Sequence, residues 1–110
     1  TNEYSIRFIE NAEDDGAIYP KLKQIRIKCS SEKKMLIALC HEYGHYVALK
    51  NDLANDEKYI RLFHGDEPIW YGNYDMTKTA YSDINEFCAS YVGMGFYNKI
   101  DLRRGGAKCG

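Results

Sequence analysis

The sequence predicts a single α+β domain, in which a small antiparallel sheet packs on a long helix and a second helix follows. Three observations lead to this prediction. The chain has 110 residues, which is enough for one hydrophobic core. Its first third alternates apolar and polar residues, as half-buried strands do. Two later segments repeat apolar residues at the helical period. We therefore interpret residues 1–110 as one domain.

The predicted sheet spans residues 4–29. Alternation over residues 4–8 indicates a first strand, and the Asp-Asp-Gly sequence at 14–16 is a turn signal. Residues 17–19 form a short apolar run before a proline, which is tolerated at the end of an edge strand. Alternation resumes over residues 24–29, with one apolar and one basic face.

The first predicted helix covers residues 31–50. The Ser30-Ser31-Glu32 sequence supplies a hydroxyl for the N-cap and an acid in the first turn. Apolar residues cover nearly the whole circumference, which is typical of a buried helix. Gly44 lies in its interior, where glycine costs about 1 kcal/mol relative to alanine. We expect another backbone to approach closely at that position.

The stretch 51–76 is polar and rich in turn residues, so it is predicted to be a variable loop region with a short helix near 56–63. The helical period returns over 79–97, in a second long helix whose start Thr79 or Ser82 could cap. The tail at 103–110 has no packing pattern, and we expect it to be mobile.

The charge and hydropathy of the chain exclude two classes of function. The formal net charge is -1, which gives no basic surface for nucleic acid. No apolar run approaches the roughly 18 residues of a membrane span, and no signal peptide is visible. The chain begins with Thr1, so its start could be trimmed. These features predict a cytoplasmic protein that binds neither nucleic acid nor membrane.

The four cysteines are Cys29, Cys40, Cys88 and Cys109, and none of them belongs to a CxxC pair. Without secretory features, this spacing favours small buried side chains and a tail thiol over a disulfide framework.

Chemistry is indicated most strongly by the sequence His41-Glu42-Tyr43-Gly44-His45, an HExxH motif inside the first predicted helix. Residues four apart lie one turn above each other, so both imidazoles can reach one metal ion. Glu42 then points to the flank of the ion, where it can take a proton from water. The alternative is a solvated polar face. The apolar neighbours argue against it, because buried His and Glu need partners that a metal supplies. The motif predicts one catalytic Zn2+.

Catalytic zinc usually has three protein ligands and one open position, so a third ligand is needed. We favour Glu86, because it lies on the second predicted helix at the edge of an apolar stripe that could pack against the first. His64 and Asp66 lie in a loop punctuated by Gly and Pro and would be held less rigidly. The candidates for this ligand are His64, Asp66, Glu67, Asp75, Asp83 and Glu86.

HExxH followed by Ile84-Asn85-Glu86 resembles the gluzincins, zinc peptidases whose third ligand is a glutamate. The layout over residues 16–97 also resembles the ImmA/IrrE-type metallopeptidases and the minigluzincins. The resemblance implies a minimal zincin-like fold and a zinc metalloendopeptidase (a hydrolase) with Glu42 as general base. Its substrate would be a peptide or protein, for example a regulatory protein cut at a specific site. Ser90 stands where the family often has Asp or Asn, which makes it a candidate for orienting a ligand histidine.

Two further roles are predicted without a ranking of the residues. Substrate could pair with an exposed strand edge at residues 24–28, although lysine on an edge strand also protects against aggregation. That strand consists of Gln24, Ile25, Arg26, Ile27 and Lys28. An additional donor to the oxyanion would come from His64, Tyr71, Tyr74 or Tyr81.

Two other functions are consistent with the motif. The first is a non-catalytic zinc-binding or partner-binding domain that keeps the zincin fold. A closed site with His64 or Cys109 as fourth ligand would favour it, whereas the intact Glu42 argues against it. The second is a different zinc hydrolase, but no phosphate-binding or sugar-binding signature accompanies the motif.

Overall fold

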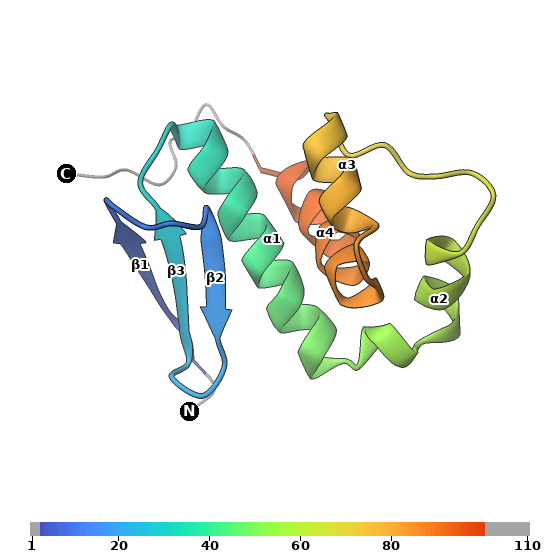
Figure 1. Cartoon of the computed structure of the whole chain (residues 1–110). Coiled ribbons are helices and arrows are strands. Elements are labelled where there is room, and N and C mark those ends of the chain that lie inside the picture. Colours follow the sequence, from blue (N-terminus) through green and yellow to red (C-terminus); the bar gives the residue numbers. More distant parts are fainter. Residues whose placement is uncertain (1–2, 101–110) are drawn as a thin grey trace.

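A computed structural model describes residues 3–100 and has a mixed α+β fold (Figure 1). A three-stranded sheet precedes the helices, and one short 3-10 helix, Leu53–Asn55, follows α1. The predicted mobile tail at 103–110 lies outside the described residues. The strands are β1 Ser5–Ile9, β2 Gly16–Tyr19 and β3 Gln24–Lys28, and the helices are α1 Glu32–Lys50, α2 Glu57–Phe63, α3 Tyr74–Ala80 and α4 Ile84–Tyr97.

The sheet has the strand order β1-β3-β2, with β1 parallel and β2 antiparallel to β3. The prediction of an antiparallel sheet is therefore wrong for one of its two strand pairs. The prediction that residues 24–28 form an edge strand is also wrong, because β3 is paired on both sides. Alternation identifies the buried face, here Ile25 and Ile27, but it carries no information about which strands are neighbours.

Helix α1 begins as predicted, because the Ser31 hydroxyl accepts a hydrogen bond from the Lys34 backbone N–H. Figure 1 shows α1 between the sheet and α4, and it contacts β2, β3 and α4. The close approach expected at Gly44 is confirmed: a Cβ atom there would lie 2.1 Å from the Ala89 carbonyl oxygen. On the other side of the crossing, a Cβ at Gly93 would lie 2.7 Å from the Cys40 carbonyl oxygen.

The second half of the chain differs from its prediction at one boundary. The short helix expected near 56–63 is present as α2. The single helix predicted over 79–97 is instead the end of α3 followed by all of α4. The cap of α4 is Asp83, whose carboxylate accepts from the Glu86 backbone N–H, and neither Thr79 nor Ser82 fills that role. Phe87 is fully buried where α3 and α4 pack together.

Two of the cysteine assignments are confirmed and one is wrong. Cys40 and Cys88 are free and buried, and burial raises the pKa of both thiols. Cys29, by contrast, is disulfide-bonded. The spacing of cysteines along the chain could not reveal this pairing, because folding alone decides which sulfur atoms meet. Within residues 3–100, no helix has the length and apolar character required to cross a membrane.

Candidate metal centre

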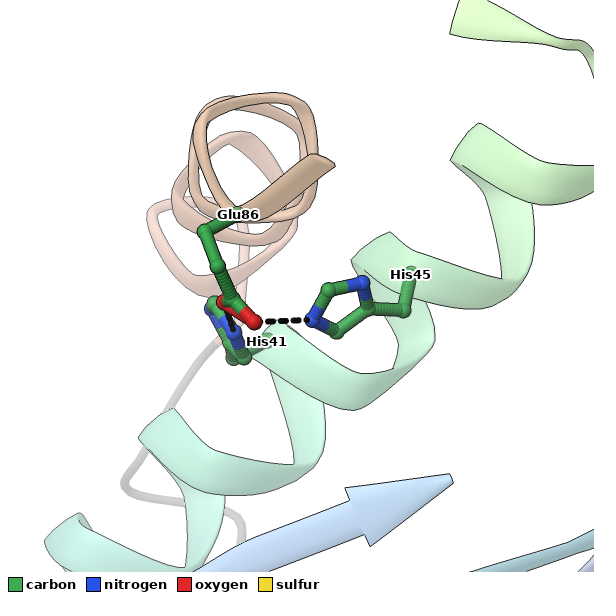
Figure 2. Close-up of side chains that lie close together, drawn as sticks. All are labelled: His41, His45 and Glu86. Atoms are coloured by element: carbon green, nitrogen blue, oxygen red, sulfur yellow. Dashed lines mark hydrogen bonds and ion pairs between the residues drawn. The ribbon is translucent and has the colours of Figure 1, made fainter. Parts of the chain in front are cut away.

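Three side chains from two helices converge on one point (Figure 2). His41 and His45 lie one turn apart on α1, and Glu86 reaches them from α4. The Nε2 atom of His41 is 2.9 Å from Glu86 Oε2, and that of His45 is 3.2 Å from Glu86 Oε1. One donor atom from each of the three residues lies within 4.8 Å of the other two.

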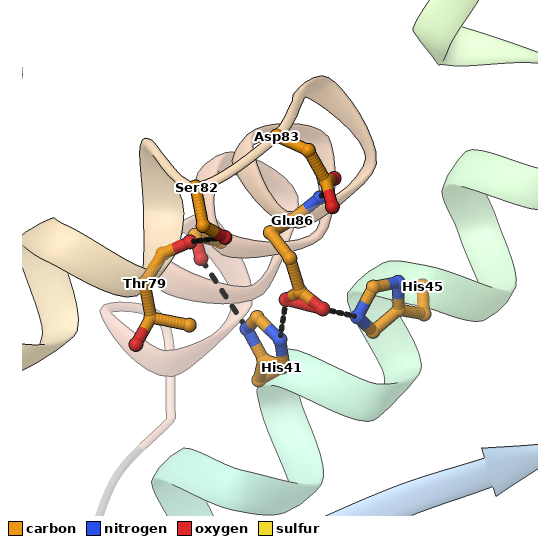
Figure 3. A network of polar contacts seen from close by, with 7 residues as sticks. His41, His45, Thr79, Ser82, Asp83 and Glu86 are labelled. Atoms are coloured by element: carbon orange, nitrogen blue, oxygen red, sulfur yellow. Dashed lines mark hydrogen bonds and ion pairs between the residues drawn. The ribbon is translucent and has the colours of Figure 1, made fainter.

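Glu86 is held in place by the start of its own helix. It lies in the first turn of α4, where Asp83 accepts a hydrogen bond of 2.9 Å from its backbone N–H. A carboxylate in the first turn also interacts favourably with the helix dipole. Figure 3 shows Asp83 and Glu86 on this turn, with the Glu86 carboxylate directed at the imidazoles of His41 and His45. The third candidate ligand therefore has a fixed backbone.

These donors fit a zinc ion. Two ligand atoms bound at about 2.1 Å in a tetrahedral arrangement are roughly 3.4 Å apart. The two contacts between imidazole and carboxylate, 2.9 and 3.2 Å, are close to that separation. Two imidazole nitrogens and one carboxylate oxygen also form a set that zinc commonly accepts in catalytic sites. Among residues 3–100, the grouping of His41, His45 and Glu86 is the one that could hold a metal ion.

Hydrogen bonds join the two imidazoles to the Glu86 carboxylate. Hydrogen bonds from His41 and His45 keep the pKa of Glu86 far below its usual range, although partial burial opposes this. Burial lowers the pKa of His45, but the hydrogen bond to Glu86 outweighs it and the net shift is upward. An imidazole nitrogen that donates to Glu86 cannot also present its lone pair to a metal. Before a metal can bind through Nε2, the proton on that nitrogen must leave or move to Nδ1 of the same ring.

Ser90 occupies the position predicted for orienting a ligand. It lies one turn after Glu86 on α4, is 8% exposed, and its Oγ atom is 3.3 Å from Nδ1 of His41. When Nε2 of His41 gives its lone pair to a metal, Nδ1 of the neutral ring carries the proton. The Ser90 hydroxyl oxygen can then accept a hydrogen bond from this Nδ1–H group. The contact matches the predicted role, without the negative charge that an aspartate would bring.

Glu42 is buried beside the candidate ligands. It is 7% exposed, and its carboxylate takes part in none of the hydrogen bonds or ion pairs between described residues. Burial raises the pKa of its carboxyl, the nearby His41 and His45 oppose the rise, and Glu86 and Asp14 add to it. The first residue of β2 closes over this carboxylate, since a Cβ at Gly16 would lie 3.2 Å from Glu42 Oε2.

A cavity of about 600 Å³ opens onto this site. Residues of α1 and α4 line it, including His41, Glu42 and Glu86. The 14–16 turn before β2 and residues of α3 also border it. Glu42 and two of the candidate ligands, His41 and Glu86, thus border a space large enough for part of a peptide.

The predicted oxyanion donors are scattered. Tyr71 borders the cavity, but its hydroxyl is buried without a hydrogen-bond partner, and burial raises its pKa. The Tyr81 hydroxyl accepts from the Ile69 backbone N–H and so already has a partner. Tyr74 is 69% exposed, and His64 follows α2 at the surface. The structure therefore brings none of these four side chains into contact with the three candidate ligands.

The other candidate ligands also lie apart from the triad. Asp66 and Glu67 are exposed in the segment between α2 and α3, Asp75 borders the cavity, and Asp83 caps α4. No protein-family model matches the chain, and neither the curated proteins nor the solved structures give a significant match. The resemblance to gluzincins therefore rests on the motif and its spacing.

Sequence reasoning missed two residues that shape the site. Asp83 fixes the first turn that carries Glu86, and the signal was present as an Asp followed three residues later by a Glu, a pattern related to the capping box. Gly16 lies against the Glu42 side chain across the fold, since a Cβ there would be 3.2 Å from Glu42 Oε2, whereas the sequence indicates only a turn at this position. No local pattern reveals such a contact, because its partner is 26 positions away in the chain.

Proposed function

We propose that this protein is a zinc-dependent peptidase, with His41, His45 and Glu86 as the metal ligands and Glu42 as the general base. One observation carries the proposal. Three donor atoms of suitable chemistry converge beside the buried carboxylate of Glu42, which forms no ion pair or hydrogen bond with another described residue, and a cavity lined by His41, Glu42 and Glu86 opens there. A purely structural metal site would have no use for that carboxylate.

The chain's own residues would divide the work. Zinc, when bound, supplies Lewis-acid chemistry: it polarises a carbonyl oxygen and makes water acidic near neutral pH. Glu42 would accept the proton of the attacking water and then deliver it to the leaving amine. Its burial limits the bulk water around the carboxylate, and the lack of a side chain at Gly16 leaves room for the carboxylate under β2. Ser90 would keep the His41 ring in the orientation that the metal requires.

The strand that could receive an extended substrate is β2. It is an edge strand, and its first residue, Gly16, borders the cavity and contacts Glu42. An extended peptide can add to such an edge through backbone hydrogen bonds that do not depend on its sequence. We therefore move the proposed substrate strand from residues 24–28 to β2. A folded regulatory protein with an exposed extended segment would be a suitable substrate.

The test is Glu42→Gln, which keeps the shape of the side chain and removes its basicity. Wild-type protein should bind one zinc by elemental analysis and cut a proteome-derived peptide library, as detected by mass spectrometry. The variant should keep its zinc and lose cleavage by at least about 100-fold, the scale of general-base catalysis. The exposed Glu67→Gln serves as a matched control and should behave like wild type.

Two results would refute the proposal. A wild-type protein that takes up no zinc would remove the metal site. A zinc-loaded wild-type protein that leaves every peptide intact would favour the non-catalytic zinc-binding domain instead. For the third ligand, Glu86→Ala should weaken zinc binding strongly, whereas His64→Ala should not, since His64 lies at the surface after α2.

A further inference from the structure

The cavity beside the candidate metal centre carries an excess of negative charge. Apart from Glu42 and Glu86, its acidic side chains are Asp14, Asp15 and Asp75, and its basic ones are Lys34 and the candidate ligand His41. The chain as a whole has a net charge of only -1, so this excess does not reflect a generally acidic protein. The acids come from two sides of the cavity, the turn before β2 and the first turn of α3.

None of these three aspartates forms an ion pair with another residue that the structure describes. Among residues 3–100, the ion pairs involve Glu86 with its two histidines and Glu57 with Arg61. The carboxylates of Asp14, Asp15 and Asp75 take part in none of them, and no hydrogen bond holds them. A cationic group in the cavity would therefore not have to compete with an existing partner.

A second feature points to a ligand in the same place. Glu42 is more than nine-tenths buried, borders the cavity and has no hydrogen-bond partner among the described residues. Apolar side chains, including Ile37, Met76 and Met94, line the cavity as well. Lys and Arg side chains combine an aliphatic stem, which can cover such apolar surface, with a charged head that can reach the aspartates.

We infer that the cavity selects peptides with a Lys or Arg side chain close to the bond that is cut, through Asp14, Asp15 and Asp75. The inference rests on the proposed peptidase function. It adds a substrate class to that function: basic segments of proteins are preferred, and acidic segments are rejected. Because the three aspartates are exposed, each contributes a modest preference of about two- to five-fold.

Binding can be measured separately from cleavage. The full chain carrying Glu42→Gln, loaded with zinc, is titrated with three labelled peptides that differ at one central residue, Lys, Gln or Glu. Fluorescence anisotropy should give the tightest binding for the Lys peptide and the weakest for the Glu peptide. The preference should shrink when NaCl is raised from about 0.05 to about 0.5 M, because salt screens exposed charges.

Charge-removing variants then locate the preference. Asp14→Asn, Asp15→Asn and Asp75→Asn, combined in the Glu42→Gln background, should bring the Lys:Gln affinity ratio close to one. Asp66→Asn removes the same charge from an exposed position outside the cavity and should leave the ratio unchanged. Circular dichroism would confirm that each variant is folded, and each single replacement should lower the ratio in part.

The two proposals fail in different ways. Equal affinity for the three peptides, no detectable binding of any of them, or a preference that survives removal of the aspartates would overturn the inference. A Lys preference in binding would support it even if wild-type protein cut none of the peptides, and that result would refute only the peptidase. Cleavage of all three peptides with equal kcat/KM would support the peptidase and overturn the inference.

Discussion

Alanine at position 44 should damage both the fold and the metal site, because the crossing of α1 and α4 leaves no room for a side chain. The added Cβ would lie 2.1 Å from the Ala89 carbonyl oxygen, and 2.9 and 3.1 Å from that residue's carbonyl carbon and Cα. Ordinary contacts between such atoms are about 3.5 Å, so the two backbones would have to separate by roughly 1.4 Å to relieve the shortest contact. Backbone atoms in two helices cannot move aside singly, as a flexible side chain can.

The magnitude follows from two opposing effects. Overpacking of a core costs about 1–3 kcal/mol, and the clash with backbone places Gly44→Ala at the upper end. Alanine recovers about 1 kcal/mol through its better helix propensity. The net loss in the free energy of unfolding should be about 1–2 kcal/mol, which lowers Tm by about 4–15 °C in a domain of this size. Thermal denaturation followed by circular dichroism measures this directly.

Zinc affinity should also fall in Gly44→Ala, because the separation of α1 and α4 that lowers stability also displaces the candidate ligand Glu86. Glu86 lies one turn before Ala89 on α4, so separation of the helices draws its carboxylate away from His41 and His45. Metal–ligand distances tolerate changes of only about 0.2 Å. We expect affinity, measured by competition with a chromogenic chelator, to fall by at least about 10-fold.

A matched control is available on α4 itself. A Cβ at Gly95 would meet no atom within 4 Å, so Gly95→Ala should be neutral or stabilising by up to about 1 kcal/mol, with unchanged zinc affinity. If Gly44→Ala were as stable as wild type and bound zinc equally well, the tight crossing of these helices would be wrong. The explanation of how Glu86 is positioned would then be wrong too.

Two further predictions concern the ligand environment. Ser90→Ala removes the hydroxyl that contacts Nδ1 of His41 and should weaken zinc binding by about 10-fold. Ser82→Ala is the control and should leave zinc binding unchanged, because the Ser82 hydroxyl donates to a backbone carbonyl. Equal zinc affinities of Ser90→Ala and wild type in a chelator competition would exclude the role of Ser90. In chelator, the lowered pKa of Glu86 contributes stability above its ordinary value of 4.5 that is lost as pH falls, and the raised pKa of His45 contributes stability below 6.5 that is lost as pH rises. The contribution of the Glu86–His pairs to the free energy of unfolding of the metal-free protein, measured by urea denaturation, should therefore be largest between pH 4.5 and 6.5. Glu86→Gln should abolish this maximum.

Local patterns predicted the parts of the fold that depend on neighbouring residues. The bounds of α1, its cap at Ser31 and the close approach at Gly44 all follow from short-range signals. The boundary between α3 and α4 was missed because Ala80 and Ile84 are spaced as if they shared one helix, although a turn separates them. A periodic pattern depends only on the spacing of apolar residues along the sequence. It cannot reveal a turn between two helices when the apolar residues on either side keep the helical spacing.

Arrangements in space were harder to predict. The pairing of β1 with β3 in parallel, ahead of β2, depends on contacts between distant segments, and a strand sequence does not state its neighbours. The predicted substrate strand at residues 24–28 is therefore the central strand β3, and β1 and β2 lie at the edges of the sheet. Glu86 was favoured as the third ligand because a helix is rigid, and the structure places its carboxylate between the two histidines.

The two glycines explain why the ligands can come from these particular helices. An ordinary helix pair keeps its axes about 8–10 Å apart, with side chains filling the space between them. Gly44 and Gly93 remove those side chains on both helices, so backbone meets backbone at the crossing. Glu86 lies less than two turns before Gly93, and at this short separation its side chain spans the gap to both imidazoles. A wider crossing would need a longer side chain than glutamate to reach the same point, so the ligand set and the glycines depend on one another.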